Sequence, residues 1–218
     1  MKASTRVANI LTVWAIGLAC LTPLSGCKGF IFSKPQAPDK HYFMLDVTPA
    51  QPTKPSGPAA TRVLNLRPFR ISPQYVNRGF VYRLSPVAWD SDFYNEYFLP
   101  PANMLAEETR LWLETSGLFA KVLDGASELD ATHVLESSIT AMYADLSDKR
   151  NPQAILEMQF LLVEEKPGNA VSIVLHENTR SVVPLKDKSP ASVAEGLSKA
   201  LGQTLTRLQS RMTETLPR

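Results

Sequence analysis

The chain has 218 residues, a formal net charge of +2 and two cysteines, and 44% of its residues are hydrophobic. A chain of this length can bury a sizeable core. The small net charge provides no basic surplus of the kind that binds nucleic acid, so we expect no nucleic-acid partner.

The N-terminus has the layout of a signal peptide. Lys2 and Arg6 give a positive start, and an interrupted apolar run follows from Val7 to Leu24. A helix that crosses the roughly 30 Å of membrane hydrocarbon needs about 20 apolar residues. This run is too short and too interrupted for that, so we expect a secretory signal at residues 1–26.

The apolar run ends in a lipobox, which is an aliphatic residue, two small residues and a cysteine. These residues are Leu24-Ser25-Gly26-Cys27. The motif predicts cleavage after Gly26 and acylation of Cys27, which becomes the lipid-bearing N-terminus. Cys20 is an alternative, but no aliphatic residue stands three places before it. An uncleaved anchor or a buried cysteine is the remaining interpretation.

Acylation at Cys27 has consequences for the mature chain. One cysteine remains and carries lipid, so no intramolecular disulfide forms. The loss of Lys2 and Arg6 leaves a neutral chain. Lys28 follows in place of the aspartate that usually retains lipoproteins at the inner membrane, which favours the periplasmic face of the outer membrane over the inner membrane. Several acyl chains on one cysteine anchor stably.

Residues 27–40 form the lipidated cysteine and a tether rich in lysine and proline. From Cys27 to His41 the chain spans at most roughly 50 Å. The folded domain is expected at residues 41–214. Its first part is expected to hold three strands, at 41–46, 62–69 and 80–84, and a short strand at 93–98, with a proline-rich loop at 48–60 and a turn at 72–79.

A helix is expected to begin at Pro100 and Pro101 and to stop at Gly117. Its apolar residues recur at helical spacing, which indicates a buried stripe. A short strand at 118–123 follows.

Three long alternating runs come next, at residues 133–145, 154–164 and 171–183. Short turns join them, so they predict an antiparallel meander. The alternation places these residues on common faces of their strands: Leu135, Ile139, Ala141 and Tyr143; Leu156, Met158, Phe160 and Leu162; Val171, Ile173 and Leu175.

The last element is a helix from about Pro190 to Thr213, capped either by Ser189 or by Ser192. Its apolar stripe is expected to pack on the sheet and consists of Val193, Leu197, Leu201, Leu205, Leu208 and Met212. The order of elements predicts a single α+β domain. We expect a mostly antiparallel sheet of about 5–7 strands with two main helices packed on one face.

Catalytic chemistry is not indicated. The three histidines, His41, His133 and His176, lie far apart in sequence. The spacings of zinc proteases, metal-binding Cys/His clusters, acyl-transfer serines and phosphate-binding glycine loops are absent. We expect no enzyme, no metal and no cofactor.

Two segments have the composition of an interaction surface. Residues 89–98 hold five aromatic side chains, and residues 69–78 mix apolar and cationic ones. Exposed aromatics and arginine dominate interfaces, so these segments indicate a surface that faces a partner or lipid. The alternative is that the aromatics belong to the core. The candidate partner-binding residues are Tyr75, Arg78, Trp89, Phe93, Tyr94 and Tyr97.

Several features occur in the order found in ABC-type transport auxiliary lipoproteins, and the chain resembles that family over most of residues 41–213. They are the lipobox at Cys27, the strand His41–Asp46, the turn Ser72-Pro73-Gln74-Tyr75-Val76-Asn77-Arg78, the run Phe80-Val81-Tyr82-Arg83 and the helix end Ser116-Gly117-Leu118-Phe119. The chain departs from the family at Tyr97-Phe98-Leu99-Pro100-Pro101, where many members have arginine and tryptophan.

The resemblance implies a binding component of an intermembrane lipid transport system. Its implied partners are a bridge protein with mammalian-cell-entry (MCE) domains and the ABC or related inner-membrane components, and it is compatible with a homo-oligomer. The alternative is a periplasmic lipoprotein that regulates or assembles a cell-envelope complex, such as a cell-wall synthase or a secretion pore. A lipid-anchored hydrolase would need a clustered Ser/His/Asp set, which the sequence does not show.

Overall fold

The computed structural model describes residues 39–49, 51–125, 127, 129–166 and 170–217. The expected signal peptide, Cys27 and most of the tether lie outside the described residues. Residues from Asp39 onward form one compact unit. Its elements are β1 (His41–Phe43), η1 (Gly57–Thr61), β2 (Val63–Leu66), β3 (Arg70–Ile71), η2 (Pro73–Tyr75), β4 (Gly79–Arg83), β5 (Trp89–Tyr97), α2 (Pro101–Thr115), β6 (Lys121–Asp124), β7 (His133–Asp145), β8 (Gln153–Lys166), β9 (Ala170–Pro184) and α3 (Pro190–Thr215).

The described strands form a nine-stranded mixed sheet in which β7 is central. On one side β7 pairs antiparallel with β8, and β8 pairs antiparallel with β9, as the meander predicts. On the other side β2, β3 and β4 pair with β7 in parallel, one after another along its length. The sheet continues through β6, parallel to β2, and through β5 and β1, where β5 is antiparallel to β4 and parallel to β1.

The expected mostly antiparallel sheet of five to seven strands is therefore wrong. The reason lies in how the short N-terminal strands are connected. Leu64 pairs with His133, Arg70 with Ser138 and Tyr82 with Ala144, so the three strands advance in line along one edge of β7. Strands that lie end to end cannot form hairpins with each other, and their shared direction makes each parallel to β7.

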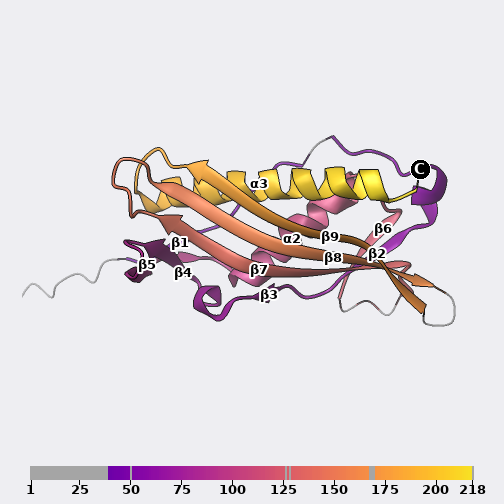
Figure 1. Cartoon of the computed structure of the whole chain (residues 1–218), viewed down its shortest axis with the longest axis horizontal. Coiled ribbons are helices and arrows are strands. Elements are labelled where there is room, and N and C mark those ends of the chain that lie inside the picture. The colour runs from indigo at the N-terminus through magenta and orange to yellow at the C-terminus, as the bar shows by residue number, and fades with distance from the viewer. Residues whose placement is uncertain (1–38, 50, 126, 128, 167–169, 218) are drawn as a thin grey trace, which may run out of the picture. The chain divides into compact units, whose positions relative to one another are not determined.

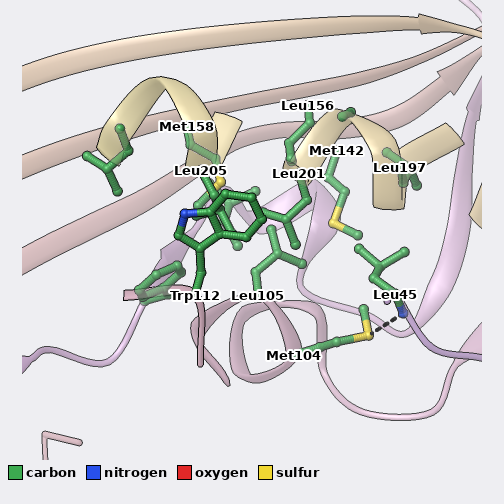
Figure 2. Close-up of a cluster of buried hydrophobic side chains, with 14 of the residues drawn as sticks. Leu45, Met104, Leu105, Trp112, Met142, Leu156, Met158, Leu197, Leu201 and Leu205 are labelled. Atoms are coloured by element: carbon green, nitrogen blue, oxygen red, sulfur yellow. Dashed lines mark hydrogen bonds between the residues drawn. The ribbon is translucent and has the colours of Figure 1, made fainter. Parts of the chain in front are cut away.

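Both helices contribute to one core against a single face of the sheet (Figures 1 and 2). Trp112 and Leu105 of α2 meet Leu201 and Leu205 of α3 in Figure 2, with Met158 of β8 beside them. The expected apolar stripe of α3 is fully buried. The cap of α3 is Ser189, whose side chain accepts a hydrogen bond from the Ser192 backbone N–H. The Ser192 hydroxyl oxygen instead accepts the backbone N–H groups of Lys186 and Asp187.

A β-bulge in β7 changes which face of the sheet its side chains occupy. The register with β8 shifts between Ile139 and Ala141. Ile139 pairs with Met158 on the helix side, whereas Tyr143 pairs with Ile155 on the outer side. A bulge inserts one extra residue and reverses the alternation beyond it. The prediction that Leu135, Ile139, Ala141 and Tyr143 share one face is therefore wrong, and Tyr143 lies on the outer face.

Candidate functional site

A wide bulge interrupts β5 at residues 92–95. Gly79 pairs with Glu96 and Val81 with Ser91, so one residue of β4 stands opposite four of β5. The Asp92 carboxylate holds this bulge. Its Oδ1 accepts the backbone N–H groups of Tyr94 and Asn95, and its Oδ2 accepts the Tyr82 hydroxyl and the Asn95 amide, each at 2.9 Å.

These hydrogen bonds set the charge of the bulge. Burial opposes ionisation of Asp92, but the hydrogen bonds from Asn95, Tyr82 and Tyr94 outweigh it and hold the pKa of that carboxyl below its ordinary value. Burial raises the pKa of Tyr82, and the hydrogen bond to Asp92 raises it further. Asp92 is therefore an acceptor with a fixed negative charge at neutral pH, and Tyr82 is a neutral donor.

Gly79 is required for the bulge because of sterics. A Cβ at Gly79 would stand 2.5 Å from the Asp92 carbonyl oxygen and 2.9 Å from the Ser91 Oγ. The backbones of β4 and β5 thus approach each other at a place where only glycine fits. Residues of both strands therefore specify the bulge: Gly79 in β4 and Asp92 in β5.

The bulge presents an exposed aromatic surface at the edge of the sheet. Phe93 is 66% exposed, and its ring lies edge-on to Tyr94 with 5.2 Å between centroids. Tyr42 of β1 meets Phe98 in the same edge-on manner at 6.2 Å, and Phe98 is 56% exposed. We call these four residues, Tyr42, Phe93, Tyr94 and Phe98, the aromatic rim.

Two cations and one buried carboxylate join the two halves of the rim. The Lys40 ammonium lies 4.4 Å from the Phe93 ring centroid, and the Arg78 guanidinium lies 5.7 Å from that of Tyr42. Both cations pair with Glu96, which is largely buried beneath them; Arg78 Nη2 lies 3.1 Å from Glu96 Oε2. That contact is an ion pair without hydrogen-bond geometry. The rim is therefore a continuous surface in which apolar rings alternate with positive groups.

A second aromatic cluster lies on the outer face of the sheet. Trp89 is 47% exposed and meets the buried Tyr143 edge-on with 5.0 Å between centroids, and Tyr75 stacks on Tyr143 with 6.3 Å between centroids. The Arg83 guanidinium lies 6.0 Å from the Trp89 ring and pairs with Asp145 at the end of β7.

Beside these rings is a pocket of about 540 Å³, which we call the Trp89 pocket. It is lined by Gln74, Tyr75, Val81, Trp89, Asp90 and Ser91. The η2 turn supplies one wall and the paired strands β4 and β5 supply the other. The rings behind this wall are buried against β7, so the pocket is a pre-formed hollow with a rigid aromatic side.

The six candidate residues fall into three groups. Phe93 and Tyr94 belong to the aromatic rim and Arg78 lies beside its Tyr42 ring, whereas Trp89 and Tyr75 line the pocket. Tyr97 is buried and packs on Phe80 with 4.5 Å between centroids. Tyr75 is also largely buried, so it supports the pocket from below.

Sequence reasoning missed four residues of this region: Lys40, Tyr42, Glu96 and Phe98. Phe98 belongs to the aromatic-rich segment 89–98, which was a usable signal. Tyr42 alternates with the core-facing Phe43 in an expected strand, so its outward position follows from the period of two. Lys40 and Glu96 join the rim through the parallel pairing of β1 with β5, for which the sequence carries no local signal.

A long open groove of about 1100 Å³ follows α3. Small side chains recur at every fourth position of its helical wall, at Ala194, Ser198, Gly202 and Thr206. The segment after β1, including Met44 and Val47, forms the facing wall.

A buried carboxylate joins β9 to α3. Glu177 is buried between β9 and α3, where its carboxylate accepts hydrogen bonds from Arg207 Nε at 2.7 Å and Arg211 Nε at 3.3 Å. Beside it the hydroxyls of Ser181 and Thr204 share a hydrogen bond of 2.9 Å. Within the described ranges, no cluster of histidine, cysteine and acidic side chains is arranged to hold a metal ion.

Among the described helices, none has the length and apolar character needed to span a membrane.

The sequence matches no known family model and no curated protein. Several solved structures are similar in fold, and two of them cover most of this chain. Protein XCC0632 from Xanthomonas campestris, assigned to the family DUF330, is 18% identical with a TM-score of 0.69, over 80% of this chain and 95% of that one. The structure of an uncharacterized protein is 12% identical with a TM-score of 0.61, over 80% of this chain and 99% of that one. At such low identity the likeness extends to the fold alone.

Proposed function

We propose that the protein is an outer-membrane-anchored lipoprotein that serves as a docking component of an ABC/MCE-type intermembrane lipid transport system. The lipid on Cys27 would hold it at the periplasmic face of the outer membrane. The folded domain would bind the bridge protein with MCE domains that reaches from the inner membrane.

The observation that carries this proposal is the Trp89 pocket. A half-exposed tryptophan at a pre-formed pocket, with an arginine beside it, is the composition of a binding hot spot. Tyr143 and Asp145 of β7 fix Trp89 and Arg83 from behind, so little side-chain freedom is lost on binding. The lipobox and the ordered motifs shared with transport auxiliary lipoproteins indicate which class of partner fills the pocket.

Site-specific photocrosslinking in intact cells tests the proposal. A photoreactive residue replaces Val87, which is 91% exposed in the turn between β4 and β5, next to the pocket. We expect a crosslink to the bridge protein. A Trp89→Ala substitution should reduce it strongly, because loss of a hot-spot tryptophan weakens binding by about 2 kcal/mol or more, which is roughly thirtyfold.

Two controls make the result specific. Leu111→Ala removes an exposed apolar residue of α2 that belongs to neither the Trp89 pocket nor the aromatic rim, and it should leave the crosslink unchanged. A photoreactive residue at Gln203 reports on the groove along α3. Bridge-protein crosslinks from Gln203 alone would contradict docking at Trp89. Crosslinks to a cell-wall synthase or a secretion pore would favour a regulatory or assembly role in the cell envelope instead.

A further inference from the structure

The aromatic rim lies at the place where the tether joins the folded domain. Lys40 stands directly before β1 and already contacts the rim through Phe93 and Glu96. The chain between Cys27 and His41 spans at most roughly 50 Å. If Cys27 carries lipid, the rim is therefore the part of the folded domain that is nearest to the anchor in sequence.

We infer that the aromatic rim is a membrane-contact surface, which lies against the same bilayer that holds the lipid anchor. This inference rests on the acylation of Cys27 in the proposed function. It adds a second attachment, made by the folded domain itself, and it assigns the rim to lipid and the Trp89 pocket to protein.

The chemistry of the rim suits the interfacial zone of a bilayer. Tyrosine side chains have an apolar ring and a polar tip, and they concentrate where hydrocarbon meets headgroups. Phe93 and Phe98 supply apolar surface that the domain itself leaves exposed. Lys40 and Arg78 stand among the rings, at the level where lipid phosphates lie.

The rim is held in its shape before it meets a membrane. Asp92 fixes the bulge through four hydrogen bonds, and Gly79 lets the strands approach closely enough to project Phe93 and Tyr94 outward. Glu96 keeps Lys40 and Arg78 beside the rings. A pre-organised surface loses little conformational entropy on binding.

Because the tether holds the domain near the membrane, a weak affinity of the rim for lipid is sufficient for contact. Once one group is anchored, a second contact on a short linker becomes intramolecular, and its effective concentration reaches the millimolar range. Four exposed rings therefore need no strong membrane affinity of their own. They would set the orientation of the domain, with the Trp89 pocket on the neighbouring outer face.

Lipid-side quenching of a fluorescent label tests the inference. The mature lipidated chain has its one cysteine blocked, so an introduced cysteine is the only free thiol. The lipidated protein with Phe93→Cys carries a nitrobenzoxadiazole label. It is reconstituted in phosphatidylethanolamine/phosphatidylglycerol vesicles that contain a nitroxide-labelled phospholipid. We expect strong quenching and a blue-shifted emission.

The matched control is Val171→Cys with the same label. Val171 is exposed and pairs with Glu165, next to the start of β7, whereas β4 and β5 lie at the other end of that strand. Because β7 has 13 residues, this label lies roughly 40 Å from the rim and should not be quenched. A Tyr42→Ser/Phe98→Ser variant should lose most of the quenching at position 93 while the protein still floats with the vesicles.

Three outcomes would overturn the inference. The first is equal quenching, or none, at positions 93 and 171. The second is protection of the position-93 label only after the bridge protein is added, which would make the rim a protein-docking surface. The third is a protein with intact Cys27 that fails to float and whose N-terminal peptide carries no acyl mass, which would remove the anchor. Because quenching at position 93 is first measured on vesicles without bridge protein, failure of docking at Trp89 is detected separately.

Discussion

The hydroxyl of Tyr82 donates a hydrogen bond to the carboxylate of Asp92, with 2.9 Å between the two oxygens. The bond joins the C-terminal part of β4 to the start of the bulge in β5. It closes a set of four hydrogen bonds on one carboxylate, and the aromatic rim depends on the shape that this set maintains.

Loss of the Asp92 carboxylate should destabilise the domain and loosen the rim. We expect Asp92→Ala to lower the free energy of unfolding by about 1–3 kcal/mol, because the partly buried Tyr82 hydroxyl and Asn95 amide lose a charged acceptor. Urea denaturation at pH 7 measures this. Asp90→Ala is the matched control two residues away on the exposed surface, and it should change stability by no more than about 0.5 kcal/mol. Equal effects of the two substitutions would contradict the role of Asp92.

The same carboxylate should contribute to acid sensitivity. Its pKa is lowered in the folded state, so the unfolded chain binds the proton more tightly. The contribution to stability is therefore complete above the ordinary value of 3.8 and is lost as the pH falls through the lower folded value. In Asp92→Ala the fall of stability below about pH 4 should be shallower than in the wild type. Parallel profiles of unfolding midpoint against pH would refute this.

Two glycines of α3 should respond oppositely to the same substitution. A Cβ at Gly196 would stand 2.3 Å from Leu185 Cδ2 and 3.0 Å from Ala154 Cβ, whereas a Cβ at Gly202 would make ordinary contact with Val47 at 3.5 Å. Gly202→Ala should stabilise the protein by up to about 1 kcal/mol through helix propensity. Gly196→Ala should destabilise it by about 1–3 kcal/mol through overpacking. Thermal unfolding of the two variants checks the signs, and a shared sign would contradict the packing of α3.

His133 should make folding sensitive to pH above the range of the carboxylates. Burial lowers its pKa, so the unfolded chain gains protons first as the pH falls. Stability should decrease as the pH falls from about 6.5 towards the lower folded value. His133→Gln should flatten the profile as the pH falls below about 6.5. An unchanged slope in this variant, measured by urea denaturation, would show that His133 is not responsible.

Substitutions of the two described tryptophans should have different effects on stability, because one is buried and the other is half-exposed. Trp112 is buried, and its indole N–H donates to Gln209 Oε1 at 2.8 Å, whereas Trp89 is half-exposed. Trp112→Ala should cost about 3–5 kcal/mol of stability. Trp89→Ala should cost less, and it should remove most of the tryptophan fluorescence that iodide quenches. Iodide quenching that persists in Trp89→Ala would mean that Trp112 is accessible.

Regular sequence patterns predict only part of the long elements. The expected common face of β7 is broken by its bulge, and that of β9 is broken by a register shift that leaves Val171 and Ile173 exposed and Leu175 buried. The stripe from Val193 to Met212 is buried as expected, and β8 keeps Leu156, Met158, Phe160 and Leu162 together on the core side. Local propensity cannot reveal which strands pair across the chain. Leu64, Arg70 and Tyr82 all pair with β7, which follows them by at least fifty residues, and no local signal distinguishes this from hairpins.

The sequence predicts which segment holds the candidate site, but it does not predict which of its side chains are exposed. The composition of residues 89–98 indicates an aromatic cluster, but the bulge at residues 92–95 decides which rings are exposed. It turns Phe93 and Tyr94 outward and leaves Tyr97 in the core. Bulges depend on tertiary hydrogen bonds such as that between Tyr82 and Asp92. The alternating sequence pattern of each strand predicts a regular strand and gives no sign of such a bond.

Crosslinking in intact cells shows whether the lipid-anchored protein docks to an intermembrane bridge. The lipidated protein is purified under denaturing conditions, and its crosslinked partners are identified by mass spectrometry. We expect a bridge protein with MCE domains, which should be absent from a Cys27→Ser variant and depleted in Trp89→Ala. Recovery of a cell-wall synthase or a secretion pore without any bridge protein would contradict it.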